Sequence, residues 1–187
     1  MRRVLLLVWV GLAAGLALAT DEASFRQLLE PLSLTFTAPA GFEPIAPPEG
    51  CDYALKGSTG ELRYAIRPLA AQVEAYQKSQ EPGSQTVAAD PNKLYSTMLL
   101  AMGANLAGVS PDRIPNQAFS PPNVKAEFGA DAGMTSAVPL GDGRLCLLNV
   151  YHKDNVADAF VYYIAADMET LKGLINTPAV FQALRFK

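Results

Sequence analysis

Two consecutive segments near the C-terminus, residues 144–152 and 156–165, are apolar at odd and at even positions alike. Successive side chains of a β-strand point to opposite faces of the sheet, so strands with this pattern bury both faces. The apolar positions are Leu145, Cys146, Leu147, Leu148 and Val150 in the first segment, and Phe160, Val161, Tyr162, Tyr163 and Ile164 in the second. The pattern therefore predicts two central strands of a sheet that is covered on both sides.

Shorter alternating patterns predict the other strands. Residues 51–68 are expected to form a hairpin, because apolar residues alternate on either side of the turn Gly57-Ser58-Thr59-Gly60. Further strands are expected at residues 32–39, 42–45 and 133–139, and a last aromatic strand at the C-terminus.

Helices are predicted at residues 20–30, 70–78, 90–107, from 120 and at 168–175. The third has the strongest signals, with Asp90 as N-cap, Pro91 in the first turn and Gly108 as a stop. Its Leu94, Met98, Met102 and Leu106 recur every four residues. Such a stripe suits either packing on a sheet, which we favour, or a promiscuous binding surface. Together these elements predict one α+β domain over residues 20–187, a three-layer α/β/α sandwich with a mainly antiparallel central sheet.

The N-terminus predicts export from the cytoplasm. A basic start, Met1-Arg2-Arg3, precedes an apolar run from Val4 to Leu18 that ends in a small-x-small site, Ala17-Leu18-Ala19. This is the pattern of a signal peptide, residues 1–19, and the run is short for a membrane span. Cleavage after Ala19 removes two basic residues and no acidic one, which takes the net charge from −3 to −5. We therefore expect a periplasmic or secreted protein that binds neither nucleic acid nor, after cleavage, the membrane.

The two cysteines leave two alternatives open. Cys51 and Cys146 form an even pair in a chain expected to enter an oxidising compartment, which favours a disulfide. The alternative is two buried thiols that pack as small hydrophobic residues. No C-x-x-C motif or second histidine accompanies them, so no metal site or cofactor is predicted.

Two groups of polar residues are candidates for binding. Arg63 and Arg67 share one face of the second hairpin strand, which suits either an anion site or the solvated edge of a sheet. His152, the only histidine, stands at a strand end beside Lys153 and Asp154. Asp131, Asp154 and Asp158 are the acids expected to lie nearest to it. A structural histidine is the favoured interpretation of His152, ahead of ligand binding and of catalysis.

The stretches "VKAEFGADAGMT" (124–135) and "HKDNVADAFVYY" (152–163), followed by a terminal aromatic strand, resemble a group of small exported bacterial proteins of unknown function. The plan of residues 32–187 is similar to the PsbP-like α/β/α sandwich, named for an extrinsic photosystem subunit and shared with a Ran-binding import factor. Members of that fold mostly act as accessory or binding proteins. The resemblance thus implies the fold and a binding role, and it implies no catalytic residues.

Two functions remain as hypotheses. The first is an accessory module without a catalytic site, which binds an envelope protein or a small ligand through Arg63 and Arg67 or around Asp131 and His152. The second is a weak hydrolase that uses His152 with Asp131 or Asp154. The chain has no G-x-S-x-G motif, so the sequence favours the first.

Overall fold

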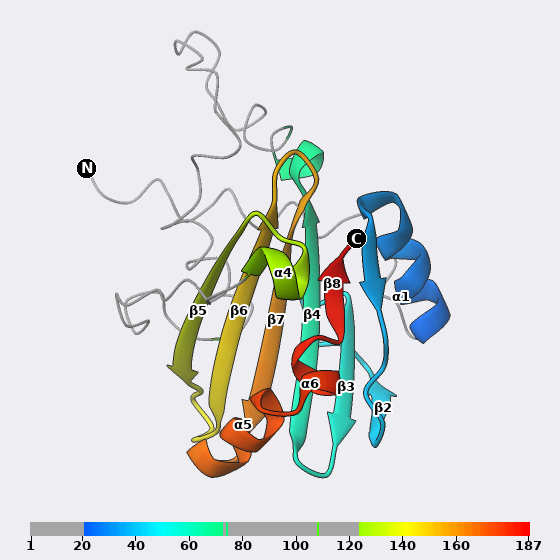
Figure 1. Ribbon diagram of the computed structural model, residues 1–187. Coiled ribbons are helices and arrows are strands. Elements are labelled where there is room, and N and C mark those ends of the chain that lie inside the picture. The colour runs from blue at the N-terminus through cyan, green and yellow to red at the C-terminus, as the bar shows by residue number, and fades with distance from the viewer. Residues whose placement is uncertain (1–20, 73, 75–107, 109–123) are drawn as a thin grey trace, which may run out of the picture.

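A six-stranded sheet organises the computed structural model, which describes residues 21–72, 74, 108 and 124–187 (Figure 1). The strands are β2 (Phe42–Ile45), β3 (Tyr53–Gly57), β4 (Gly60–Pro68), β5 (Ala132–Pro139), β6 (Leu145–Lys153) and β7 (Ala157–Ala165). Their order is β2-β3-β4-β7-β6-β5, and each neighbouring pair is antiparallel. The described part of the chain is therefore an α+β fold with an antiparallel sheet, as predicted.

Tight turns join β3 to β4 and β6 to β7. In the first, Gly60 has a φ of +158°, and a Cβ at this position would collide with the carbonyl oxygen of Ile164 on β7. Only glycine fits so close to a neighbouring strand. In the second, Asn155 adopts a left-handed φ of 59°, which asparagine tolerates better than most residues. The two hairpins pair with each other through β4 and β7, which form the centre of the sheet.

The first face of the sheet is covered by five short helices and a two-stranded sheet (Figure 1). These elements are α1 (Glu22–Leu29), η1 (Glu30–Leu32), α4 (Val124–Phe128), α5 (Met168–Ile175), α6 (Pro178–Phe181), β1 (Leu34–Phe36) and β8 (Leu184–Phe186). Strands β1 and β8 pair antiparallel, so the two ends of the described chain lie side by side. Under α1, the ring of Phe25 stacks on Tyr53 with centroids 4.7 Å apart and meets Phe36 edge-on at 5.2 Å. Such aromatic pairs add about 1 kcal/mol each beyond their buried area.

The second face of the sheet is buried as well. Its centre is a cluster that includes Ala65, Cys146, Leu148, Val150, Phe160, Tyr162 and Ile164. Among the described residues no helix contributes to this cluster. The prediction that β6 and β7 bury both faces is therefore confirmed, since every residue of β7 is buried.

Several predicted elements agree closely with the structure. The expected strands at 133–139, 144–152 and 156–165 match β5, β6 and β7 to within one residue, and α5 has the predicted bounds. The strand expected at 32–39 is shorter, because Leu32 ends a 3-10 turn and only Leu34–Phe36 pair with β8. The predicted signal peptide, the helices at 70–78 and 90–107 and the first residues of the helix from 120 lie largely or wholly outside the described residues. Among the described residues, no helix is long and apolar enough to span a membrane.

The predicted disulfide between Cys51 and Cys146 is not formed in the structure, which holds both cysteines as free, buried thiols. Cys51 lies two residues before the start of β3, whereas Cys146 lies in β6, and β4 and β7 stand between these strands. Three strand spacings amount to about 14 Å, twice the Cα separation that a disulfide spans. Burial raises the pKa of Cys51 to about 11 and that of Cys146 to about 12.

Candidate functional site

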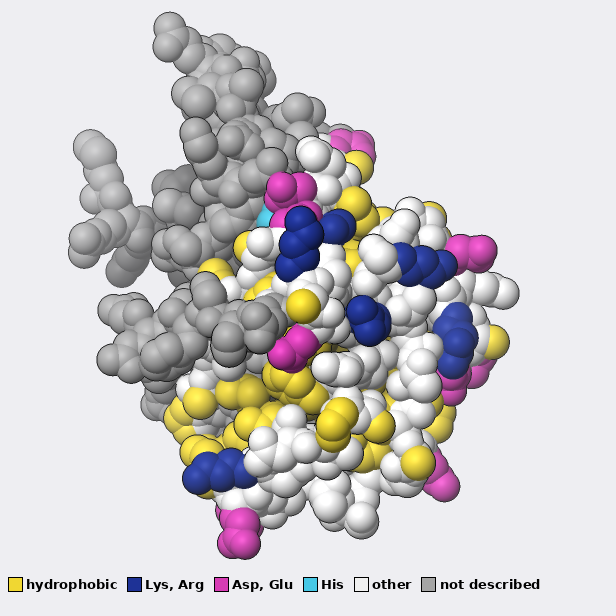
Figure 2. All heavy atoms as spheres, in the orientation of Figure 1, with side chains coloured by type: hydrophobic (Ala, Val, Ile, Leu, Met, Phe, Trp, Pro, Cys, Tyr) yellow, Lys and Arg dark blue, Asp and Glu magenta, His cyan; other side chains and the backbone are white. Residues whose placement is uncertain are grey.

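The polar residues predicted around His152 do come together, at one end of β5, β6 and β7. His152 is the penultimate residue of β6 and lies opposite Asp158 of β7 and Ala132 of β5. Asp154 belongs to the turn between β6 and β7, and Asp131 immediately precedes β5. We call His152, Lys153, Asp154, Asp131 and Asp158 the His152 cluster. Figure 2 shows the histidine, in cyan, almost hidden beside acidic and basic side chains.

His152 lies between two carboxylates. Its Nδ1 is 2.9 Å from Oδ1 of Asp158, and its Nε2 is 2.9 Å from Oδ1 of Asp154. The residue stands at a strand end, as predicted, and is only 5% exposed. Burial alone would lower the pKa of His152, but the hydrogen bond and charge of Asp158, followed by those of Asp154, raise it above the ordinary value. The two carboxylates therefore favour the charged form of the ring.

Asp158 links the histidine to β4. Its side chain is fully buried, and its second oxygen accepts a hydrogen bond of 2.7 Å from Nε2 of Gln72. The same Gln72 amide donates to the backbone carbonyl of Arg67, the residue opposite Asp158. Arg67 in turn donates to Oδ2 of Asp52 at 3.0 Å and to the carbonyl of Gly50. A continuous polar network thus crosses one end of the sheet.

Asp131 does not contact the ring of His152. Its Oδ2 accepts from the backbone N–H of Asp154 at 3.1 Å, and its Oδ1 lies 3.4 Å from Nζ of Lys153. The hydrogen bond from Asp154 and the interaction with Lys153 lower the pKa of Asp131. Lys153 also donates to the carbonyl of Gly129 at 2.8 Å. Asp131 and Lys153 therefore fasten the β6–β7 turn to the start of β5.

Arg63 belongs to a second ion-pair network, at the opposite end of the same sheet face. It pairs with Glu61, whose other oxygen lies 3.1 Å from Nη1 of Arg144. Burial by itself would raise the pKa of Glu61, but Arg63 and then Arg144 lower it overall. Of the two alternatives for Arg63 and Arg67, the solvated sheet edge is wrong, because β4 lies between β3 and β7 and both arginines pair with acids of the chain.

These contacts decide what the predicted residues can do chemically. Both ring nitrogens of His152 face carboxylates, so neither is placed to take a proton from a nucleophile. No hydroxyl group of the described residues hydrogen-bonds to the ring, and no cluster of three metal-ligating side chains occurs among them. The candidates Arg63, Arg67 and Lys153 are likewise engaged by acids and carbonyl groups of the chain itself.

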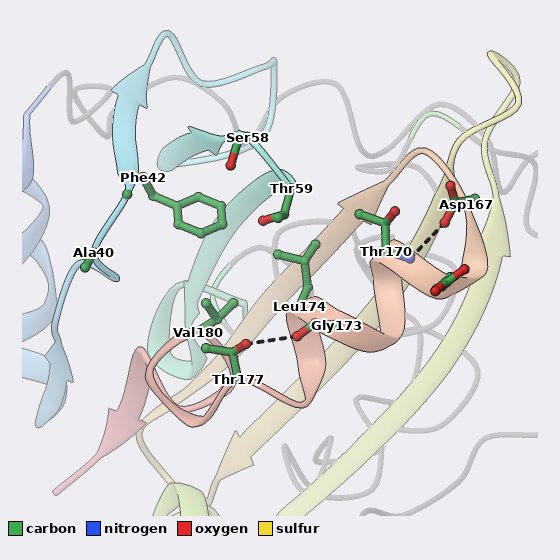
Figure 3. A pocket seen from close by; sticks show the side chains of 12 residues that line it. Ala40, Phe42, Ser58, Thr59, Asp167, Thr170, Gly173, Leu174, Thr177 and Val180 are labelled. Atoms are coloured by element: carbon green, nitrogen blue, oxygen red, sulfur yellow. Dashed lines mark hydrogen bonds between the residues drawn. The ribbon is translucent and has the colours of Figure 1, made fainter.

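An open groove lies beside α5, away from both networks (Figure 3). It has a volume of about 560 Å³ and is bounded by β2, the β3–β4 turn, α5 and the start of α6. Its lining residues are Ala40, Gly41, Phe42, Ser58, Thr59, Asp167, Glu169, Thr170, Gly173, Leu174, Thr177 and Val180. We call this the α5 groove. Its volume falls within the usual range for small-molecule sites.

The polar groups of the α5 groove differ in how far they are engaged. Asp167 caps α5 by accepting from the backbone N–H of Thr170 at 2.8 Å, and Thr177 donates to the carbonyl of Gly173 at 2.9 Å. The side chains of Ser58, Thr59 and Glu169 are exposed and form no hydrogen bond or ion pair with the described residues. The groove therefore keeps donors and acceptors that the fold itself does not use.

The sequence did not indicate this groove. Ser58 and Thr59 were assigned to a hairpin turn, and the signals around Asp167 are those of an ordinary helix start. Nothing local predicts that this turn, β2 and α5 meet. A search of protein-family models and a search of curated proteins each find no match to the chain.

Proposed function

We propose that the protein is an exported, non-catalytic binding module of the cell envelope, which takes a small ligand or a partner group into the α5 groove. The proposal rests on the difference between two groups of polar side chains. The ionisable side chains of Arg63, Arg67 and His152 are paired within the chain. In contrast, Ser58, Thr59 and Glu169 line an open groove, and their side chains have no partner among the residues that the structure describes. Concave sites with a few uncommitted polar groups are where proteins most often bind small molecules.

Export is proposed from the N-terminal sequence. The basic start, the uncharged run from Val4 to Leu18 and the Ala17-Leu18-Ala19 site together support cleavage after Ala19. The mature chain would then act in the periplasm or outside the cell.

A three-layer, PsbP-like sandwich is the finer fold that we propose. The described helices cover the first face of the sheet, while the second face carries a large buried apolar cluster. A covering layer on that second face is what the PsbP-like plan implies. Accessory and binding roles are what the resemblance to that fold implies, although a fold alone is a weak argument for function.

The hydrolase hypothesis receives less support from the geometry. A general base needs an accessible nitrogen within hydrogen-bond reach of the proton that it removes. The pairing of His152 with Asp154 and Asp158 opposes that role. Loss of a measured hydrolytic activity in a folded His152→Asn variant would revive the hypothesis.

Native mass spectrometry of the protein isolated from its own envelope fraction, without reductant, tests the proposed function. We expect a mass that corresponds to cleavage after Ala19, both thiols reduced, and an additional retained mass that is lost on denaturation. A folded protein that carries no ligand or partner and turns over a screened substrate would contradict the proposal. Comparison with the Ser58→Ala/Thr59→Ala variant then shows whether the retained mass depends on the α5 groove.

A further inference from the structure

The walls of the α5 groove combine an aromatic ring, an apolar floor and hydroxyl groups. Phe42 projects its ring into the space between the β3–β4 turn and the two helices (Figure 3). Leu174 and Val180 are buried beneath and form the floor. Ser58 and Thr59 lie at the turn beside the ring. A bound molecule would therefore meet an aromatic face, an apolar surface and hydroxyl groups at once.

The charge of the groove has one sign. Asp167 and Glu169 are the only ionisable residues among the twelve that line it, and no lysine, arginine or histidine does. The hydrogen bonds from Thr170 lower the pKa of Asp167, which keeps this carboxylate charged at neutral pH. Because Asp167 already caps the N-terminus of α5, that helix end offers little attraction to an anion.

From this combination we infer that the α5 groove binds a small organic cation that carries a hydroxyl group, of the alkylammonium or quaternary ammonium class. The inference rests on the proposed binding function and names its ligand class. A quaternary ammonium group is attracted to the face of an aromatic ring, here Phe42, and at longer range to the carboxylates at the start of α5, Asp167 and Glu169, which line the other end of the groove (Figure 3). Its hydroxyl group has Ser58 and Thr59 as hydrogen-bonding partners.

Choline and its uncharged isostere 3,3-dimethylbutan-1-ol provide a matched pair of probes. The two molecules have the same shape and hydroxyl group and differ in the positive charge. We would titrate each into the ¹⁵N-labelled, naturally processed protein and follow the amide resonances of Ser58, Thr59 and Gly173. Choline is expected to shift these resonances in a saturable manner, and to bind at least about fivefold more tightly than the isostere.

Variants of the groove separate its charge from its shape. Glu169→Gln is expected to weaken choline binding about threefold, since it removes one exposed carboxylate. Phe42→Leu keeps an apolar side chain but removes the aromatic face, and is expected to weaken binding about fivefold. The control is Glu49→Gln, which makes the same charge change at an exposed loop residue outside the groove and should leave binding unchanged.

Three outcomes are informative. Saturable choline shifts that weaken in Glu169→Gln but not in Glu49→Gln would support the inference. Equal binding of the two probes would overturn the selection for charge, although a binding groove would remain. Absence of shifts at Ser58, Thr59 and Gly173 with either probe would overturn the cation site. The native mass spectrum decides the proposed function separately, because it requires only that some ligand or partner is retained.

Discussion

The His152 cluster and the α5 groove use polar residues in opposite ways. In the cluster, nearly every charge meets a partner, and His152 and Asp158 are withdrawn from solvent. In the groove, polar side chains lie exposed on an apolar floor, and three of them have no partner within the described part of the chain. Buried charges without partners are costly, so a fold that buries charges must pair them. The single histidine of this chain is thus paired within the fold, whereas the candidate binding site is formed by common residues.

The largest loss in the free energy of unfolding is expected from Asp158→Ala, which tests whether the His152 cluster stabilises the fold. The variant leaves His152 and Gln72 without their buried partner, which should cost about 3 kcal/mol in the free energy of unfolding. Urea denaturation measures this cost. The matched control is Asp154→Ala, whose side chain is 53% exposed and should cost less than about 1 kcal/mol. Equal losses in the two variants would mean that burial does not set the importance of these pairs.

A smaller loss is expected from Arg67→Ala. Asp52 would remain buried without the guanidinium group that pairs with it, at a cost of about 2 kcal/mol. Arg26→Ala provides the comparison, because Arg26 pairs with Glu22 on the exposed face of α1 and should contribute less than about 0.5 kcal/mol. If Arg67→Ala unfolds at the urea concentration of the wild type, the polar network does not stabilise the sheet end.

The pH dependence of stability tests whether His152 is charged in the folded protein. The folded state raises the pKa of His152 above its ordinary value of 6.5. The resulting stabilisation is fully present below the unfolded pKa and is lost as the pH rises through the folded pKa. The urea midpoint of the wild type, relative to that of His152→Asn, should therefore fall as the pH rises above 6.5. Parallel midpoints over this range would argue against a charged histidine in the cluster.

The smallest change in the free energy of unfolding is expected for substitutions in the α5 groove. Ser58→Ala combined with Thr59→Ala removes two hydroxyl groups that the fold does not use, so the free energy of unfolding should change by less than about 0.5 kcal/mol. Thermal and urea unfolding of the double variant provide the measurement. A loss comparable to that of Asp158→Ala would show that these hydroxyl groups support the fold instead of a ligand.

Local patterns in the sequence were sufficient to predict much of the fold. Alternation predicted the β3–β4 hairpin, and two-sided hydrophobicity predicted β6 and β7 as buried strands. The place of β4 was not predictable, because it depends on pairing with β7, which lies about a hundred residues later in the chain. No local pattern encodes that pairing, so Arg63 and Arg67 were assigned to a solvated edge.

The same distinction between local patterns and long-range pairing applies to the residues of the candidate site. Asp154 and Asp158 were expected near His152, since strands joined by a tight turn bring such residues together. Gln72 and Arg67 joined the network only through the long-range pairing of β4 with β7. The α5 groove depends on contacts among β2, the β3–β4 turn and α5, and each of these segments has an ordinary sequence.

A titration of His152 by NMR tests the central claim most directly. The chain contains one histidine, so its ring Cε1–H resonance is assigned without ambiguity. If His152 is a charged bridge between Asp154 and Asp158, its pKa will lie above 6.5 and will fall in a folded Asp154→Asn variant. A pKa at or below 6.5 in the wild type would contradict the account, because it would describe a neutral ring available for ligand binding or catalysis.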